Sequence, residues 1–503
     1  MKTEYDVAVV GLGPVGAVLA SLLGRSGLSV VAIEKDVDVF PLPRAAHIDH
    51  TGLRTLQGIE CLDQVLPDMI RNKRLNLLNA QRQVLTSISA DQESISGLPT
   101  SAYFYQPDFD VVLRRAATRY ESVHVKLGAT VDEISSAAGS GNVAIKLTHS
   151  TGYGEVITAK WLVGCDGARS FVREAIGINL KSLDFDEKWL VVDLNVDVRK
   201  AGLPADHVIE VCDPARPYLS TPISATRQRF EFMLLPGEVA EDMTKKDVIA
   251  GLLAAWLEGS LYTVERAAVY TFHGVVAEQW RKGRVLIAGD AAHQTPPFLG
   301  QGMCTGLRDA ANLAWKLMRV VQDKAGTALL DTYESERAPH AVKVIQAAIR
   351  IGKTICELDP TRAAERDRLL LADDRGVRQS LAFSLPNLER GPLILEGGGS
   401  LFVQSRIGGE LTDDIIGPRF FVLARSAAAL GSTVGWWKTE LDAHVALISD
   451  FQSPGILRWF DSCEAEVVVV RPDRYVLGTA ESLDDVTRVV AGVLSRHTTE
   501  GVS

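Results

Sequence analysis

Short apolar segments alternate with helical patterns through much of this chain. Residues 5–10, 28–33 and 285–288 are dominated by valine, leucine, isoleucine and alanine, which is typical of strands buried in a parallel sheet. Glycine-containing turns and apolar residues at helical spacing follow the first and third of them, which predicts an α/β fold. Helices are also predicted over 51–58, 106–119 and 329–371. A small sheet is predicted from 123–134, 143–149 and 155–163.

The pattern changes to strand-like alternation between residues 181 and 275. Such segments predict an antiparallel sheet with one solvated face, inserted so that it covers a substrate. Pro392 and the glycines at 397–399 then mark a boundary, and strands alternate with helices beyond it. We therefore predict a discontinuous domain (1–180 and 276–375), an inserted sheet domain (181–275) and a small α/β domain (396–503).

Composition and charge narrow the range of partners. With 503 residues, 46% hydrophobic and 23% charged, the chain has the composition of an ordinary globular protein, and its net charge of −10 predicts neither nucleic acid nor an anionic membrane as a partner. No signal peptide or spanning segment is expected at the start of the sequence or elsewhere. The six cysteines are scattered without CxxC and the histidines without HExxH, so we expect cytoplasmic, reduced thiols and no metal site.

A glycine-rich turn follows the first predicted strand. Gly11, Gly13 and Gly16 form GxGxxG between that strand and a helix, and Glu34 ends the next strand. The glycines permit a tight turn and close approach of a pyrophosphate to the helix N-terminus, and the carboxylate can accept ribose hydroxyls. Strand, helix and acid occur together, so we predict a dinucleotide site here.

A second ligand-binding stretch runs from residue 283 to 316. Gly289 and Asp290 end a strand, where ligands of open α/β sheets bind, and Pro297, Gly300 and Gly302 shape a loop that a planar ligand can approach closely. Asp166-Gly167 forms a third strand-to-turn segment, which alone would be an ordinary Asp-Gly turn. Arg44, taken alone, would be a solvated charge.

Together, GLGPVG with Glu34, GCDGARS and GRVLIAGDAAHQTPPFLGQGMCTGLRDAANLAWKL resemble the single-component (class A) FAD-dependent aromatic hydroxylases. The stretches PRAAHID, QTPPFLGQGM and RPDRYVLGTA are most similar to the 3-(3-hydroxyphenyl)propionate hydroxylase branch. The resemblance implies a Rossmann-like FAD-binding domain with an inserted antiparallel-sheet substrate domain and a thioredoxin-like carboxy-terminal domain. That last domain lacks CxxC here, which disfavours a redox role.

The resemblance also implies the cofactor contacts. FAD would be bound, with NADH or NADPH as a transient co-substrate. The implied cofactor-binding residues are Gly11, Gly13, Val15, Gly16, Glu34, Lys35, Arg44, Gln106, Asp166, Gly167, Gly289, Asp290, Pro297, Gly300, Gln301, Gly302 and Met303.

The implied reaction is hydroxylation of a phenolic, phenylpropanoid-like acid ortho to its hydroxyl, with O2 and NAD(P)H, through a flavin hydroperoxide that Pro297 helps to hold. Segment 224–230 is similar to SATRxRY in the 4-hydroxybenzoate hydroxylases, which places Arg229 near the flavin. The carboxylate-binding arginine of those enzymes corresponds to Ile223 here, which disfavours a short benzoate. His47 and Tyr218 are candidates for removing the phenol proton, although a packed or solvated loop histidine is the more common role for a residue such as His47.

Two other functions stay open. One is hydroxylation of a polycyclic aromatic such as a polyketide, and the other is a flavin-binding protein without turnover. A homodimer is kept as one alternative for the oligomeric state.

Overall fold

The computed structural model describes residues 3–136, 141–259, 261–372, 384–451 and 453–495. Its central eight-stranded sheet has the order β17-β18-β11-β1-β2-β8, with β9 and β10 attached through β11. The five consecutive strands from β18 to β8 run parallel to one another. The strands are β1 (Glu4–Val10), β2 (Val30–Glu34), β8 (Val123–Leu127), β9 (Ala129–Ser136), β10 (Val143–His149), β11 (Gly154–Gly164), β17 (Arg281–Lys282) and β18 (Val285–Ile287).

The predicted small sheet at 123–163 is not separate. β8 pairs with β2, and β11 is long enough for its first half to pair with β10 while its second half pairs with β1. One strand therefore joins both sheets, and the alternating β9–β10 pair extends the buried parallel strands toward solvent.

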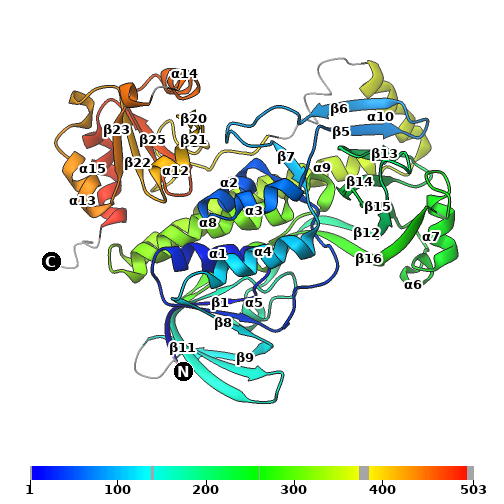
Figure 1. The fold of residues 1–503 in the computed structure, drawn as a ribbon, viewed down its shortest axis with the longest axis horizontal. Helices are drawn as coiled ribbons and strands as arrows, with labels where there is room; N and C mark the ends of the chain where they lie inside the picture. The colour runs from blue at the N-terminus through cyan, green and yellow to red at the C-terminus, as the bar shows by residue number, and fades with distance from the viewer. Residues whose placement is uncertain (1–2, 137–140, 260, 373–383, 452, 496–503) are drawn as a thin grey trace.

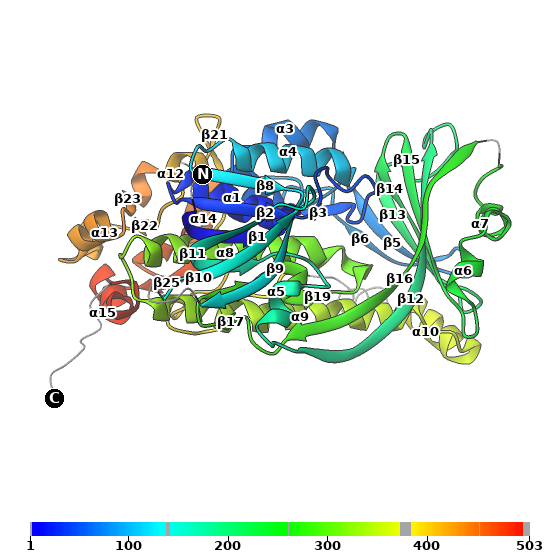
Figure 2. The same ribbon diagram turned by 90° about the horizontal axis from the view of Figure 1, so that it is seen from below.

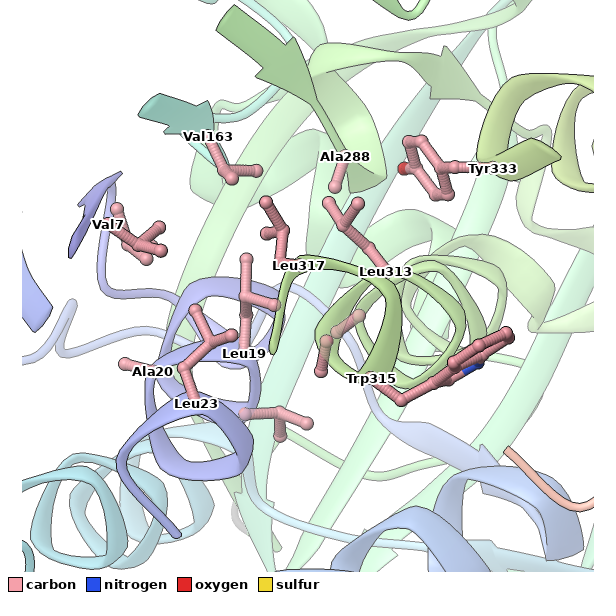
Figure 3. Packing of buried hydrophobic residues seen from close by; sticks show 14 of the residues in the cluster. Val7, Leu19, Ala20, Leu23, Val163, Ala288, Leu313, Trp315, Leu317 and Tyr333 are labelled. Atoms are coloured by element: carbon pink, nitrogen blue, oxygen red, sulfur yellow. The ribbon is translucent and has the colours of Figure 1, made fainter. Parts of the chain in front are cut away.

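Apolar faces of α1 (Pro14–Arg25), α4 (Gln106–Thr118) and α8 (Gln301–Val321) cover this sheet. Figure 3 shows Leu19 and Leu23 of α1 gathered with Leu313 and Leu317 of α8 beside strand residues such as Val163. All five side chains are fully buried, and burial of a leucine contributes roughly 1.5–3 kcal/mol. The cluster holds α1 and α8 in place, and the N-termini of both helices lie at the same side of the sheet.

A second eight-stranded sheet has the order β19-β16-β12-β15-β14-β13-β5-β6. Its strands are β5 (Arg74–Asn79), β6 (Val84–Ser89), β12 (Leu180–Val196), β13 (His207–Cys212), β14 (Tyr218–Ser224), β15 (Arg227–Met233), β16 (Tyr262–Ala277) and β19 (His293–Gln294). The sheet extends beyond 181–275, because β5 pairs in parallel with β13 and covers what would be an open edge. Helices α6 (Ala240–Met243) and α7 (Lys246–Leu253) lie on one face; α9 (Asp331–Ile355) and α10 (Pro360–Ala372) lie toward the other (Figure 2).

A three-stranded sheet of β3 (His47–Asp49), β7 (Ser101–Tyr103) and β4 (Ile70–Arg71) lies between α8 and β14 of the second sheet. Helices α2 (His50–Gly58) and α3 (Leu62–Val65) lie between β3 and β4 in the chain. The short α5 (Phe171–Ala175) follows β11. Among the helices that the structure describes, none is long and apolar enough to cross a membrane.

The carboxy-terminal part lies at the opposite end of the molecule from the second sheet (Figure 1). Its main sheet has the order β23-β22-β24-β25, made of β22 (Phe421–Ala424), β23 (His444–Leu447), β24 (Val467–Val470) and β25 (Val476–Ala480). Helices α12 (Thr412–Ile416), α13 (Val434–Glu440), α14 (Pro454–Ser462) and α15 (Leu483–Leu494) and the pair β20 (Arg406–Ile407) and β21 (Glu410–Leu411) complete it. Buried ion pairs join it to the rest: Arg471 to Glu336 at 2.8 Å, and Asp413 to Arg54 at 2.6 Å.

Candidate functional site

A cleft of about 570 Å³ lies at the carboxyl ends of the parallel strands. Most of the predicted cofactor residues line it: Gly11, Gly13, Val15, Glu34, Lys35, Arg44, Gln106, Asp166, Gly167, Asp290, Pro297, Gly302 and Met303. Four do not. Gly16 and Gly289 lie behind the lining, Gly300 lines a neighbouring pocket, and the Gln301 side chain accepts a hydrogen bond from Arg308 at 2.8 Å.

Two of the three glycines in the glycine-rich turn, Gly11 and Gly16, are packed too tightly for a side chain. Gly11 has φ +92°, and a Cβ there would lie 2.5 Å from the carbonyl oxygen of Cys165. A Cβ on Gly16 would lie 2.0 Å from the carbonyl oxygen of Gly11. The first turn of α1 therefore rests directly on the loop, and its free N–H groups are available to an anion such as a pyrophosphate.

Glu34 and Gln106 both shape the backbone of the cleft. Glu34 accepts hydrogen bonds from the N–H of Leu12 at 2.7 Å and of Asp36 at 3.1 Å, which ties the glycine-rich turn to β2. Gln106 Oε1 accepts from the N–H groups of Arg44 and Ala45, at 2.8 and 2.6 Å. Both side chains still line the cleft, so each combines a structural hydrogen bond with a position suited to a ligand.

Asp290 follows β18 and exposes its side chain to the cleft, while the protein around it desolvates the carboxyl group and raises its pKa. The preceding turn is held by Asp309, which accepts hydrogen bonds from the Gly289 N–H (3.1 Å), His293 Nε2 (2.7 Å) and Arg337 Nε (2.9 Å). Asp309 was not predicted as a site residue. An acid on the apolar face of a predicted helix was the available signal.

Asp166 has a structural role beside its place in the cleft. It accepts hydrogen bonds from Ser170 Oγ at 2.5 Å and from the Val172 N–H at 3.0 Å, and so holds the start of α5. Partial burial raises the pKa of its carboxyl. The ordinary Asp-Gly turn and the position beside a ligand thus coexist in one residue.

Two observations indicate that the residues lining the cleft fit FAD. Asp110 Oδ1, Arg114 Nε and Thr295 Oγ1 are buried without a hydrogen-bond partner in the described protein, and all three residues line the cleft. Ribose, phosphate or ring atoms would satisfy such groups. A Cβ added to Gly13, Gly167 or Gly302 would meet nothing within 4 Å, so the backbone there is open to close approach.

A second pocket of about 240 Å³ adjoins the cleft. It lies between the loop at 297–303 and the inner face of the second sheet, and it shares Arg44, Ala45, Thr295, Pro297, Gly302 and Met303 with the cleft. Its other polar lining residues are His47, Asn72, Tyr103, Glu210, Thr221, Arg229 and Glu231. A molecule in this pocket would lie across the shared loop from a ligand in the cleft.

Arg229 is buried in this pocket wall. Its guanidinium donates to Asp193 Oδ1 at 2.7 Å and to the carbonyl oxygens of Arg44 and Pro43 at 2.8 and 2.9 Å. Its charge is neutralised by Asp193, and its N–H groups fix the segment that lines both cavities. Arg229 therefore holds the loop in place through backbone contacts.

Both ring nitrogens of His47 are hydrogen-bonded, one to the loop at 297–303 and the other to β7. Nδ1 lies 3.0 Å from the carbonyl oxygen of Gly300, which can only accept, so Nδ1 carries the proton. Nε2 then accepts from Ser101 Oγ at 2.7 Å. Burial lowers the pKa of His47, which favours this neutral form. His47 thus positions the loop and offers no free nitrogen as a base.

The structure does not bring Tyr218 to the pocket, which corrects the expectation that it assists there. Its ring packs against Phe232 and Trp256, with centroids 5.8 and 6.0 Å away, on the outer face of the sheet near α7. Neighbouring residues of β14 point to opposite faces, so Leu219 and Thr221 line the pocket instead.

Burial and the nearby Glu231 raise the pKa of Glu210 from an ordinary 4.5 to about 8. An acid whose pKa is raised by folding stabilises the fold fully only below about pH 4.5, and that stability is lost as pH rises to about 8. We expect Glu210→Gln to raise the melting temperature at pH 8 and to leave it nearly unchanged at pH 4.5. Thermal unfolding across this range measures the difference; a variant equally stabilised at both pH values would contradict it.

Comparisons with known proteins agree with this geometry. The FAD binding domain family matches residues 4–348. A probable NADH-specific resorcinol 4-hydroxylase of Rhodococcus jostii is 34% identical, over 95% of this chain and 92% of that protein. A 3-(3-hydroxy-phenyl)propionate/3-hydroxycinnamic acid hydroxylase of a Mycobacterium species is 34% identical, over 99% of this chain and 93% of that protein.

Solved structures show the same fold. The complex of aklavinone-11 hydroxylase with FAD and aklavinone superposes with a TM-score of 0.81, at 24% identity over 97% of this chain and 99% of that one. The flavin-dependent monooxygenase PieE gives a TM-score of 0.82 at 19% identity, over 97% of this chain and 99% of that one. A glycine-rich turn, a cleft fitted to FAD and near-complete coverage of these relatives agree: the chain belongs to the FAD binding domain family and is a class A FAD-dependent aromatic hydroxylase that uses NAD(P)H.

Proposed function

We propose that this enzyme hydroxylates a single-ring phenol ortho to its hydroxyl, and that the phenol binds in the pocket beside the loop at 297–303. The shared lining carries the proposal: Pro297, Gly302 and Met303 belong to both cavities, so a ring in the pocket lies next to the flavin end of the cleft. Bound FAD supplies the redox chemistry that couples NAD(P)H and O2 to the aromatic ring.

The protein's own residues position and enclose the reactants. His47 holds Gly300, and Arg229 holds the carbonyls of Pro43 and Arg44, so the two segments between the cavities are fixed from opposite sides. Phe298 and Leu219, both buried, help to exclude water from the pocket. Such fixed placement supports oxygen transfer to one ring carbon.

The size of the pocket and the names of the relatives narrow the class of aromatic substrate. A pocket of about 240 Å³ suits one ring better than a polycyclic substrate. Resorcinol and 3-(3-hydroxyphenyl)propionate, the compounds for which the relatives are named, both carry a hydroxyl and a second substituent meta to it. Sequence resemblance favours the phenylpropanoid-like acid.

Six free cysteines and the use of NAD(P)H favour the cytoplasm as the location of the enzyme.

The test is NADH and NADPH oxidation by the purified holoenzyme with a panel of meta-substituted phenols, followed by mass spectrometry of the products. We expect consumption stimulated by a phenol and a product heavier by one oxygen atom, placed ortho to the original hydroxyl by NMR. Oxidation that yields only hydrogen peroxide with every phenol, or a hydroxyl placed elsewhere on the ring, would count against the proposal.

A further inference from the structure

Two buried carboxyl groups line the substrate pocket opposite the flavin-side loop. Glu210 lies on β13 and Glu231 on β15, and Leu219 of β14 stands between them in the register of the three strands. They therefore share one face of the sheet, about 10 Å apart at Cα by the spacing of strands. Glu210 is 3% and Glu231 6% exposed, and both line the pocket.

Neither carboxyl group is fully satisfied by the protein. The Oε2 atoms of Glu210 and Glu231 are both buried without a hydrogen-bond partner among the described residues. A buried polar atom left unpaired costs on the order of 1–3 kcal/mol, and a ligand hydroxyl that pairs with it recovers that free energy. The two atoms therefore indicate a ligand that carries hydroxyl groups.

The charges around the pocket leave no cation for an anionic substrate. Among the described residues that line it, the cations are Arg44 and Arg229. Arg229 is paired with Asp193, which also pairs with Arg266 at 2.7 Å, and Arg229 lies 3.9 Å from Glu231.

Arg44 is directed to the other side of the loop. Its guanidinium stacks on Phe40 at 4.1 Å, and its charge acts on Asp110 and Asp290 in the cleft. The charged group that acts on Glu210 is Glu231, another acid. The raised pKa of about 8 keeps Glu210 uncharged at neutral pH, and Arg229 already balances Glu231. A substrate carboxylate in the pocket would therefore be buried with no counter-ion of its own among the described residues, which disfavours binding strongly.

We propose that Glu210 and Glu231 are the specificity-determining residues of the pocket, which bind the hydroxyl groups of an uncharged di- or polyhydroxylated benzene and exclude substrates that carry a carboxylate. This inference rests on the proposed function and deepens it. It replaces the phenylpropanoid-like acid predicted from sequence resemblance with a neutral compound of the resorcinol type.

The test compares binding of matched ligands to the holoenzyme by isothermal titration calorimetry. The probes are resorcinol, 3-(3-hydroxyphenyl)propionate and its primary amide, which differs from the acid mainly in charge. We expect resorcinol to bind and the amide to bind about 100-fold more tightly than the acid, because burial of a carboxylate without a counter-ion costs several kcal/mol. Equal or tighter binding of the acid overturns the inference.

Two variants locate the effect. Glu231→Gln is expected to reduce the amide-to-acid preference about tenfold, because it removes an acid that opposes a substrate carboxylate. Glu210→Gln is expected to weaken resorcinol binding, because it removes a partner for a ligand hydroxyl. A uniform structural effect would instead change the binding of all three ligands alike. The control is Glu187→Gln, on β12 of the same sheet, which lines neither cavity. A Glu231→Gln protein with the wild-type amide-to-acid preference, or a Glu210→Gln protein with wild-type resorcinol affinity, also overturns the inference. Absence of hydroxylated product from every phenol would instead contradict the proposed function, while the binding ratios still test the pair.

Discussion

Gly16→Ala is expected to yield a folded but colourless protein that retains less than about a tenth of the wild-type FAD and does not oxidise NADH. The added Cβ would lie 2.0 Å from the Gly11 carbonyl oxygen, which is backbone and cannot turn away as a flexible side chain could. Either α1 or the glycine-rich loop must shift, at a cost of roughly 1–3 kcal/mol for overpacking, and the N–H groups facing the pyrophosphate move with it.

The measurement is flavin absorbance per mole of purified protein, combined with circular dichroism. Gly58→Ala is a matched control, since a Cβ at the end of α2 meets nothing within 4 Å. The control should keep its FAD. A yellow Gly16→Ala protein with wild-type FAD content would show that the turn is not where the pyrophosphate binds.

Arg229→Ala is expected to slow flavin reduction by NAD(P)H on the order of 100-fold, with a smaller loss of FAD affinity, because small misplacements of reacting groups have effects of that size. The substitution releases the carbonyls of Pro43 and Arg44, and Arg44 lines both cavities, whereas FAD would keep its contacts along the cleft. Loss of one partner of a buried ion pair should also lower the free energy of unfolding, by at most about 3–5 kcal/mol, because Asp193 is fully buried and keeps, among the described residues, only Arg266 as its counter-ion.

Stopped-flow absorbance of the anaerobic holoenzyme measures the reduction rate, and FAD titration measures affinity. Arg227→Ala is the control, because Arg227 lies two residues earlier on β15, forms a half-buried pair with Glu265 and lines neither cavity. Reduction at the wild-type rate in Arg229→Ala would refute the positioning role, whatever the change in stability.

The parts of the site that could be predicted are local in sequence. The turn from Gly11 to Gly16, the acid at Glu34 and the loop after Asp290 each combine strand, turn and helix within a few residues, so periodicity and glycine spacing reveal them. All of these segments meet at the cleft in the structure.

What could not be predicted depends on pairings between distant segments. β5 and β13 lie more than a hundred residues apart, and nothing in either sequence specifies their parallel register. Which residues of a strand face the pocket depends on the alternation of side chains along it. Tyr218 and Leu219 are neighbours, yet only Leu219 lines the pocket. A shift of the pairing by one residue would reverse this. The Glu210–Glu231 pair exists only because three strands align, so no segment alone predicts an acidic wall.

The ion pairs that join the carboxy-terminal part to α2 and α9 bear on how the polypeptide matures during synthesis. Glu336 pairs with Lys316 and with Arg471, and Arg54 pairs with Asp413. Arg471 and Asp413 lie in the carboxy-terminal part, so they are translated after the residues they pair with. Until they emerge from the ribosome, Arg54 lacks its buried counter-ion and Glu336 lacks one of its two. Shortened products that end near residue 396 should consequently depend on chaperones or be degraded, so the last hundred residues act as the completion step of folding.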